Sequence, residues 1–227
     1  MELNQNIIKT LKEKTSTKQE VFHKVINHFE NFKARLRTVA ESYHHEIIKH
    51  DDRVDIQYSS KGSYDAKLKF GGDTLLFHMH TNVFGFEENH PIWKIGYVKE
   101  DPLRAYCGMI NIYNFLSDSF KFNRVNDAGY LIARIFINKD NHFFVDGKRQ
   151  LGFLFTDFAN AEISDANIDK IIEASLVYSL DFDLLTPNYS AMQRVTINQI
   201  IELTKNMKLT TDKRLGFKYS WERNDLK

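Results

Sequence analysis

The sequence contains little cysteine, proline and glycine, and it has no long apolar run. Among 227 residues there are one cysteine, three prolines and ten glycines. A single cysteine excludes an internal disulfide, and so few prolines and glycines argue against long linkers or disorder. No stretch approaches the roughly 18 apolar residues of a membrane span, and residues 1–10 lack the apolar run of a signal peptide. We therefore expect a cytoplasmic protein that has no membrane partner.

The formal charge of the chain is close to zero. Lysine and arginine total 31 against 30 for aspartate and glutamate, which gives a formal charge of +1. Such a balance gives no general reason to expect nucleic acid or an anionic membrane as partner. The 18 phenylalanines indicate a well-packed core, and 227 residues suffice for one large domain. We expect a single domain over residues 1–227.

A β-hairpin at residues 64–81 is the clearest local signal. Residues 64–70 alternate apolar and polar side chains, and Gly71 and Gly72 follow as a two-residue turn. This turn pairs Phe70 with Asp73 and then, on the same core face, three pairs of apolar residues: Leu68 with Leu75, Ala66 with Phe77, and Tyr64 with Met79. The other face pairs Lys69 with Thr74, Lys67 with Leu76, Asp65 with His78, and Ser63 with His80. A shift by one residue would bury His78 and Lys67, so this register is favoured; residues 54–58 predict a third strand beside it.

The N-terminal 50 residues are predicted to be helical. A short helix over residues 3–14 is expected to break at Thr15 and Ser16, where Thr17 and Glu20 form a capping box for a second helix, residues 18–49. Apolar residues recur in this helix at steps of three and four: Phe22, Val25, Phe29, Phe32, Leu36, Val39 and Tyr43. This seam fits a dimerisation arm, or a helix about 48 Å long packed along its own sheet. The phenylalanines favour the second interpretation.

The remainder of the chain predicts more strands and then helices. Strands are expected at residues 92–98, 106–115, 130–137, 142–145 and 148–155, although 106–115 also fits a helix. Asp146 and Gly147 are expected to form the turn between the last two strands, and residues 117–127 a loop. The short connections predict antiparallel pairing. The predicted class is α+β: a helical segment (1–50), a mainly antiparallel curved sheet (54–156), C-terminal helices (164–206) and a late strand (215–222). Ser164 and Thr196 are the expected helix caps.

A metal site on the hairpin is the best candidate for chemistry. His78 and His80 lie two residues apart on one strand, and the register places Asp65 opposite His78. Two imidazoles and a carboxylate are a common ligand set for zinc or iron. The simpler alternative is a solvated sheet face. The spacing of Gly72, His78 and His80 resembles the opening of the cupin metal motif, but the glutamate expected shortly after the second histidine is absent, so no cupin activity is inferred.

Three weaker patterns have simpler structural explanations. Asp55, Asp65 and Lys67 have the outline of a metal-dependent nuclease core. Cys107 is a candidate nucleophile, although a lone buried cysteine usually behaves as a small apolar residue. Basic and aromatic residues interleave near the C-terminus, as in sites for single-stranded nucleic acid: Lys213, Arg214, Phe217, Lys218, Tyr219, Trp221 and Arg223.

Two hypotheses for function remain open. The first is a non-enzymatic binding or self-association module, which binds a small ligand, another protein or a second copy of itself through the helix 18–49. The second is a metal-dependent enzyme, of hydrolase or oxygenase type, that uses Asp65, His78 and His80. No phosphate loop and no common hydrolase motif occurs in the sequence.

Overall fold

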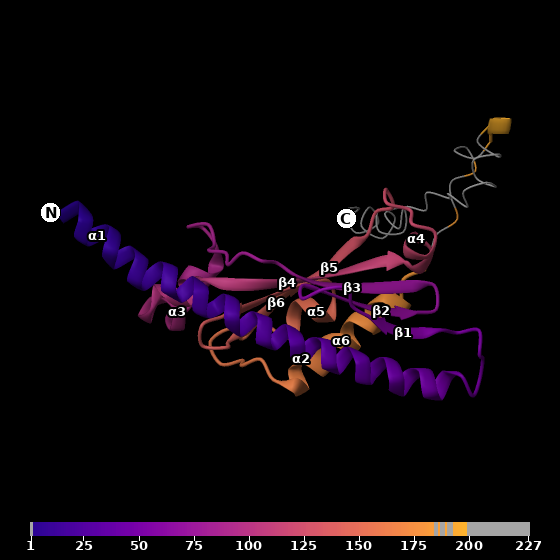
Figure 1. The fold of residues 1–227 in the computed structure, drawn as a ribbon, viewed down its shortest axis with the longest axis horizontal. Coiled ribbons are helices and arrows are strands. Elements are labelled where there is room, and N and C mark those ends of the chain that lie inside the picture. Colours follow the sequence, from indigo (N-terminus) through magenta and orange to yellow (C-terminus); the bar gives the residue numbers. More distant parts are fainter. Residues whose placement is uncertain (1, 184–185, 187–188, 190–192, 199–227) are drawn as a thin grey trace, which may run out of the picture.

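A six-stranded antiparallel sheet carries two long helices on one face (Figure 1). The computed structural model describes residues 2–183, 186, 189 and 193–198. The predicted α+β class is confirmed. The predicted strand at 215–222 lies outside the described residues, as does nearly all of the helix expected from Thr196 to about residue 206.

The strands follow one another in the order of the sequence. They are β1 Ile56–Ser59, β2 Asp65–Phe70, β3 Asp73–Met79, β4 Cys107–Leu116, β5 Tyr130–Asn138 and β6 Phe143–Gly147. Each strand pairs antiparallel with the next, and β1 and β6 form the two edges of an open sheet. Short turns join β1 to β2, β2 to β3 and β5 to β6 and leave no length for a crossover, whereas residues 80–106 and 117–129 form the longer connections on either side of β4.

The hairpin register is confirmed for the six predicted pairs from Asp65 to Phe70. β2 pairs with β3 through Phe70 and Asp73 next to the turn, and through Asp65 and His78 at the far end. Of the two turn glycines, Gly71 adopts a positive φ of 57°, a conformation that residues with a Cβ rarely adopt. β1 lies beside β2, as expected for the third strand.

The N-terminal helical segment is continuous, and the predicted break is wrong. α1 (Glu2–Thr10), a π-helical turn (Leu11–Thr15) and α2 (Ser16–Ile47) follow without interruption. Thr15 keeps helical dihedral angles (φ −73°, ψ −39°) and makes no side-chain cap. No proline or glycine stands in this segment to end the helix. The expected capping box does not form, because Thr17 lies inside the continuous helix rather than at its start.

The apolar seam of α2 packs on the protein's own sheet. Val25, Phe29, Phe32 and Leu36 are fully buried there. The helix approaches β4 closely, because a Cβ on Gly108 would lie 2.6 Å from a methyl carbon of Val25. These seam residues are therefore unavailable to a partner helix. Self-association through residues 18–49 stays a prediction.

α6 (Asp165–Leu180) completes the covered face, as predicted. Ser164 caps it, with its hydroxyl oxygen accepting a hydrogen bond from the Asn167 N–H at 3.3 Å. Arg35 on α2 donates to Asp169 on α6 (Nε to Oδ1 2.6 Å), which ties the two helices together. The predicted inner face of the helix is buried: Ile168, Ile171, Ile172, Ser175, Leu176 and Ser179.

The strand predicted at residues 92–98 is wrong, and short helices occupy this stretch. Two 3₁₀ turns, Pro91–Lys94 and Pro102–Ala105, flank α3 (Gly96–Glu100). His90 and Asp101 each cap the turn that follows, accepting hydrogen bonds from the N–H groups of Ile92 and Leu103. A capping side chain followed by proline favours a helical start, and this local chemistry outweighs the β-branched residues.

Two further expectations are corrected. Part of the predicted loop 117–127 is the helix α4 (Ser117–Lys121), and α5 (Gln150–Phe153) replaces the predicted strand at 148–155. α5 packs directly on the end of β6, since a Cβ on Gly147 would lie 2.8 Å from the Leu151 Cβ. In the described part of the chain, no helix has the length and apolar character needed to cross a membrane.

Candidate functional site

The sheet face opposite α2 and α6 is covered unevenly. At one end, residues 86–105 fold over β4, β5 and β6 and enclose a small second core: Ile92, Val98, Ala105, Cys107, Phe136 and Phe158. At the other end, α4 and the turns that follow it surround a hollow. Both ends carry clusters of polar side chains, and each is a candidate site.

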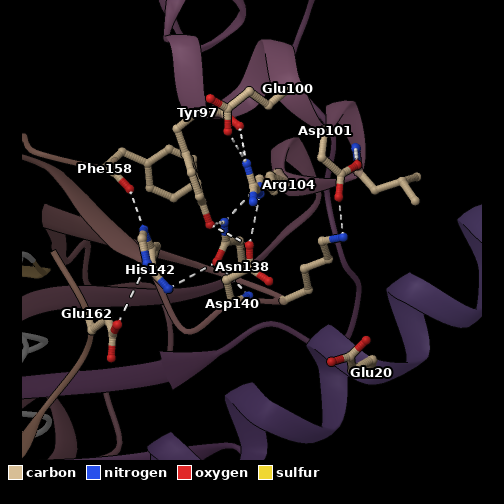
Figure 2. Close-up of polar contacts among 12 residues, drawn as sticks. Glu20, Tyr97, Glu100, Asp101, Arg104, Asn138, Asp140, His142, Phe158 and Glu162 are labelled. Atoms are coloured by element: carbon tan, nitrogen blue, oxygen red, sulfur yellow. Dashed lines mark hydrogen bonds and ion pairs between the residues drawn. The ribbon is translucent and has the colours of Figure 1, made fainter. Parts of the chain in front are cut away.

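A polar network joins residues 86–105 to the turn between β5 and β6 (Figure 2). It consists of Tyr97, Arg104, Asn138, Asp140 and His142. The Tyr97 hydroxyl donates to Asp140 Oδ2 at 2.7 Å, and Arg104 Nε donates to the same oxygen at 3.0 Å. The Arg104 guanidinium also lies 4.1 Å from the centre of the Tyr97 ring, and the His142 ring stacks on Tyr97 at 4.6 Å.

Asn138 at the centre of the polar network has every hydrogen-bonding group satisfied. Its Nδ2 donates to the Tyr97 hydroxyl (3.0 Å) and to the Arg104 carbonyl (3.3 Å). Its Oδ1 accepts from the N–H groups of Asp140 and His142, both at 3.0 Å. The side chain thus uses two donors and two acceptor positions, the full capacity of an amide, at 0% exposure. Such saturation is typical of a structural element.

The ionisation states in the polar network agree with this role. Burial raises the pKa of Tyr97 to about 12, so the hydroxyl remains a donor at neutral pH. Burial alone would raise the pKa of Asp140, but the hydrogen bonds from Tyr97 and Arg104 hold it below its ordinary value. Arg104 is therefore compensated by Asp140 and also by Glu100, 3.1 Å away, so the polar network leaves no unpaired cation for an anionic ligand.

The hollow at the other end is a large basic groove. It has a volume of about 980 Å³ and lies over the outer faces of β1, β2 and β3, with α4 as one wall. This volume is within the range of small-molecule sites. The side chains around it include five basic and two acidic residues: Lys61, Lys67, Lys69, Lys121 and Arg124, against Asp118 and Asp127. We call this hollow the basic groove.

Two of the five cations are neutralised within the protein. Lys69 pairs with Asp55 at 2.7 Å. Arg124 and Asp127 form a buried pair at 3.7 Å, with side chains 6% and 3% exposed, and Asp127 also accepts a hydrogen bond from Ser119. For the three remaining lysines, no carboxylate in the described part of the chain lies within the 4.0 Å of an ion pair: Lys61, Lys67 and Lys121.

An aromatic ring, rather than a carboxylate, positions Lys67. Its Nζ lies 3.9 Å from the centre of the Phe120 ring on α4. Phe120 stacks edge-on against Phe115 at 5.3 Å, and Phe115 is fixed because its ring fills the space that a Cβ on Gly129 would occupy, 2.3 Å away. Burial lowers the pKa of Lys67 and the nearby charge of Lys61 lowers it further, while the charge of Asp65 opposes both effects without cancelling them. Lys67 is thus a partly desolvated cation that forms no close ion pair, although the charge of Asp65 reaches it.

The predicted metal site is only partly assembled. Asp65 and His78 are cross-strand neighbours, as predicted. His80 lies just beyond β3, where its Nδ1 accepts a hydrogen bond from the Asn82 N–H at 3.0 Å and its ring packs edge-on against Phe84. Across the described residues, no three histidine, cysteine, aspartate or glutamate side chains gather as a metal ion requires. Metal binding by Asp65, His78 and His80 stays a prediction.

The sequence patterns missed the basic groove as a site. The strand alternation placed Lys67 and Lys69 on the outer face correctly, but Lys61 and Lys121 reach the groove only through a turn and through α4. Alternate lysines on one strand are the one signal that was available. Cys107 is fully buried, and burial raises the pKa of its thiol, which agrees with a core role.

Comparisons of the chain with protein-family models, with curated proteins and with solved structures found no match. The inference of function therefore depends on the geometry described above.

Proposed function

We propose that the protein is a non-enzymatic binding module that holds a small anionic ligand in the basic groove. The observation that carries this proposal is the set of three lysines, Lys61, Lys67 and Lys121, that surround the groove without a carboxylate partner in the described chain. A bound anion would supply the missing counter-charge. The ligand would lie on the sheet face that α2 and α6 leave uncovered.

The contrast in charge compensation favours the groove over the polar network. In the network, Arg104 and Asp140 satisfy each other and surround a saturated amide. In the groove, Lys67 has lost part of its hydration, and the more distant charge of Asp65 does not offset this loss. Because a desolvated charge is costly unless it is paired, a site that tolerates one is often a site for a charged ligand.

The overall charge of the protein sharpens this argument. With a formal charge of +1, the chain as a whole attracts anions only weakly. Any affinity for an anion must therefore arise locally, from the excess of positive charge around the basic groove. Binding should weaken as salt is added, because these lysines are partly exposed to solvent.

Titration calorimetry at low ionic strength tests the proposal. The probes are sulfate, citrate and inorganic pyrophosphate as anions, glucose as a neutral control and spermidine as a cationic control. We expect binding of at least one anion and of neither control. Lys67→Glu should abolish binding, whereas Lys94→Glu, on an exposed lysine in the segment at the other end, should not. The proposal fails if no anion binds, or if the two variants respond alike.

The metal-dependent enzyme is the second hypothesis, and the pairing of Asp65 with His78 is the one observation that favours it. Elemental analysis of protein purified without chelator would test it. Stoichiometric zinc or iron that is lost in His78→Ala would support the hypothesis, and the absence of bound metal would end it.

A further inference from the structure

The cations around the basic groove that lack a carboxylate partner are all of one residue type. The arginine that lines the groove, Arg124, is buried against Asp127. The three cations without a carboxylate partner are all lysines. Arginine presents a planar fork that matches two oxygens of a carboxylate or a phosphate, whereas a lysine ammonium is a compact charge whose three donors can point to different oxygens. Several ammonium groups around one groove therefore suit a multiply charged oxyanion such as a phosphate, which has an oxygen for each lysine.

The position of Lys67 fits the receipt of such a group. Phe120 lies against its ammonium at 3.9 Å and holds it through the negative face of the ring. The ring occupies one side of the ammonium and does not cancel its charge. Lys61 is close enough to lower the pKa of Lys67, and Asp65, which accepts a hydrogen bond from the Lys61 backbone N–H at 3.3 Å, offsets this effect only in part. An anion between the two lysines would relieve the repulsion that remains.

The size and the walls of the basic groove indicate more than an inorganic ion. Its volume of about 980 Å³ greatly exceeds what one phosphate group needs. Apolar surface lies beside the lysines, with Phe120 at 38% exposure and Val125 at 81% exposure. The groove thus offers charge at one part of its surface and apolar contact at another.

From these observations, we infer that the ligand of the basic groove is a phosphorylated small molecule, with a terminal phosphate or diphosphate held by Lys61, Lys67 and Lys121. The organic part of the ligand contacts Phe120 and Val125. This inference rests on the proposed function, since it names the chemical class of the ligand in the same groove. Phe120 acts in it as a positioning residue, which holds Lys67 in place.

The experiment compares anions that differ in chemistry. Inorganic pyrophosphate is titrated against citrate, a carboxylate of similar charge, against sulfate, and against a short oligothymidylate that lacks terminal phosphates. We expect pyrophosphate to bind about tenfold more tightly than citrate. The variant Lys61→Gln/Lys67→Gln/Lys121→Gln should lose this binding. The control Lys94→Gln/Lys99→Gln/Lys170→Gln removes the same charge from exposed lysines elsewhere and should keep it.

Each result separates the inference from the proposed function. Tight binding of pyrophosphate that only the groove variant loses supports both. Equal affinity for citrate, sulfate and pyrophosphate, all lost in the groove variant, overturns the phosphate inference and leaves the anion module standing. Preference for the oligothymidylate overturns the inference in favour of a phosphodiester chain. Binding of no anion overturns both.

A second pair of variants tests the role of Phe120. Phe120→Leu removes the ring beneath Lys67, and we expect pyrophosphate to bind several-fold more weakly while the circular dichroism spectrum stays unchanged. Phe120→Tyr keeps an aromatic face and should restore the affinity. Equal affinity in the leucine and tyrosine variants would show that the ring does not position the lysine.

Discussion

The polar network and the basic groove, at the two ends of the sheet face opposite α2 and α6, differ in how their charged side chains are paired. In the polar network, Asn138 is saturated with hydrogen bonds and Arg104 is paired with Asp140. In the basic groove, Lys67 is partly desolvated and has an aromatic ring where a carboxylate would be expected. Both sites lie on the same face of one sheet. The difference therefore comes from the segments beside them, which are residues 86–105 at one end and α4 at the other.

This difference separates polar groups that hold the fold from polar groups that are available to a ligand. A saturated buried amide contributes stability, because its loss leaves partners without hydrogen bonds. A desolvated cation without a counter-charge costs stability, which a ligand can recover on binding. Substitutions at the two ends should therefore have opposite effects on stability.

The largest effect is expected at Asn138. Asn138→Ala leaves the Tyr97 hydroxyl, the Arg104 carbonyl and two backbone N–H groups without their partner. We expect the free energy of unfolding to fall by about 3 kcal/mol, measured by urea denaturation. Asn160→Ala, on an exposed side chain, is the control and should change it by less than about 0.5 kcal/mol. Similar losses in the two variants would contradict a structural role for the polar network.

A smaller effect distinguishes two lysines on the same face of β2. Lys69→Gln removes the ion pair with Asp55 and should lower the free energy of unfolding by about 0.5 kcal/mol, because the pair is partly exposed. Lys67→Gln removes a desolvated charge and should leave the melting temperature unchanged or raise it. Both values come from thermal denaturation without ligand. If Lys67→Gln lowered the stability as much as Lys69→Gln does, the proposed difference between a lysine that stabilises the fold and a lysine that binds a ligand would be wrong.

The smallest effect is the pH dependence of stability that Lys67 contributes. Its pKa is lower in the folded protein than in the unfolded chain, because burial and Lys61 disfavour the charged form. At neutral pH Lys67 is protonated in both the folded and the unfolded state, so its desolvated charge lowers the free energy of unfolding by the full amount. As the pH rises through the folded pKa, the folded protein loses the proton first and the cost is relieved.

The advantage of Lys67→Gln in melting temperature should therefore shrink as the pH rises above neutral. Thermal denaturation of the variant and the wild type across this range measures it, and an NMR titration of the Lys67 side chain gives the pKa directly. An advantage that grows with pH, or a Lys67 pKa above the ordinary lysine value, would contradict the assigned cause.

Local patterns predicted the elements whose signals are short-range. The alternation of residues 64–70 and the paired glycines predicted the register of β2 and β3 correctly. The cap at Ser164 and the apolar face that follows predicted α6. At residues 92–98 the same reasoning failed, because caps at His90 and Asp101 outweighed the strand propensity of the residues between them.

The sequence by itself determined the α+β class, the hairpin register and the apolar seam of α2, since each depends on the period of side chains along one element. Only the tertiary structure decided that the seam faces the protein's own sheet, and that Lys61, Lys67 and Lys121 surround one groove. Those lysines come from a turn, a strand and a helix. Convergence of distant segments depends on how the segments pack, and no local pattern encodes it.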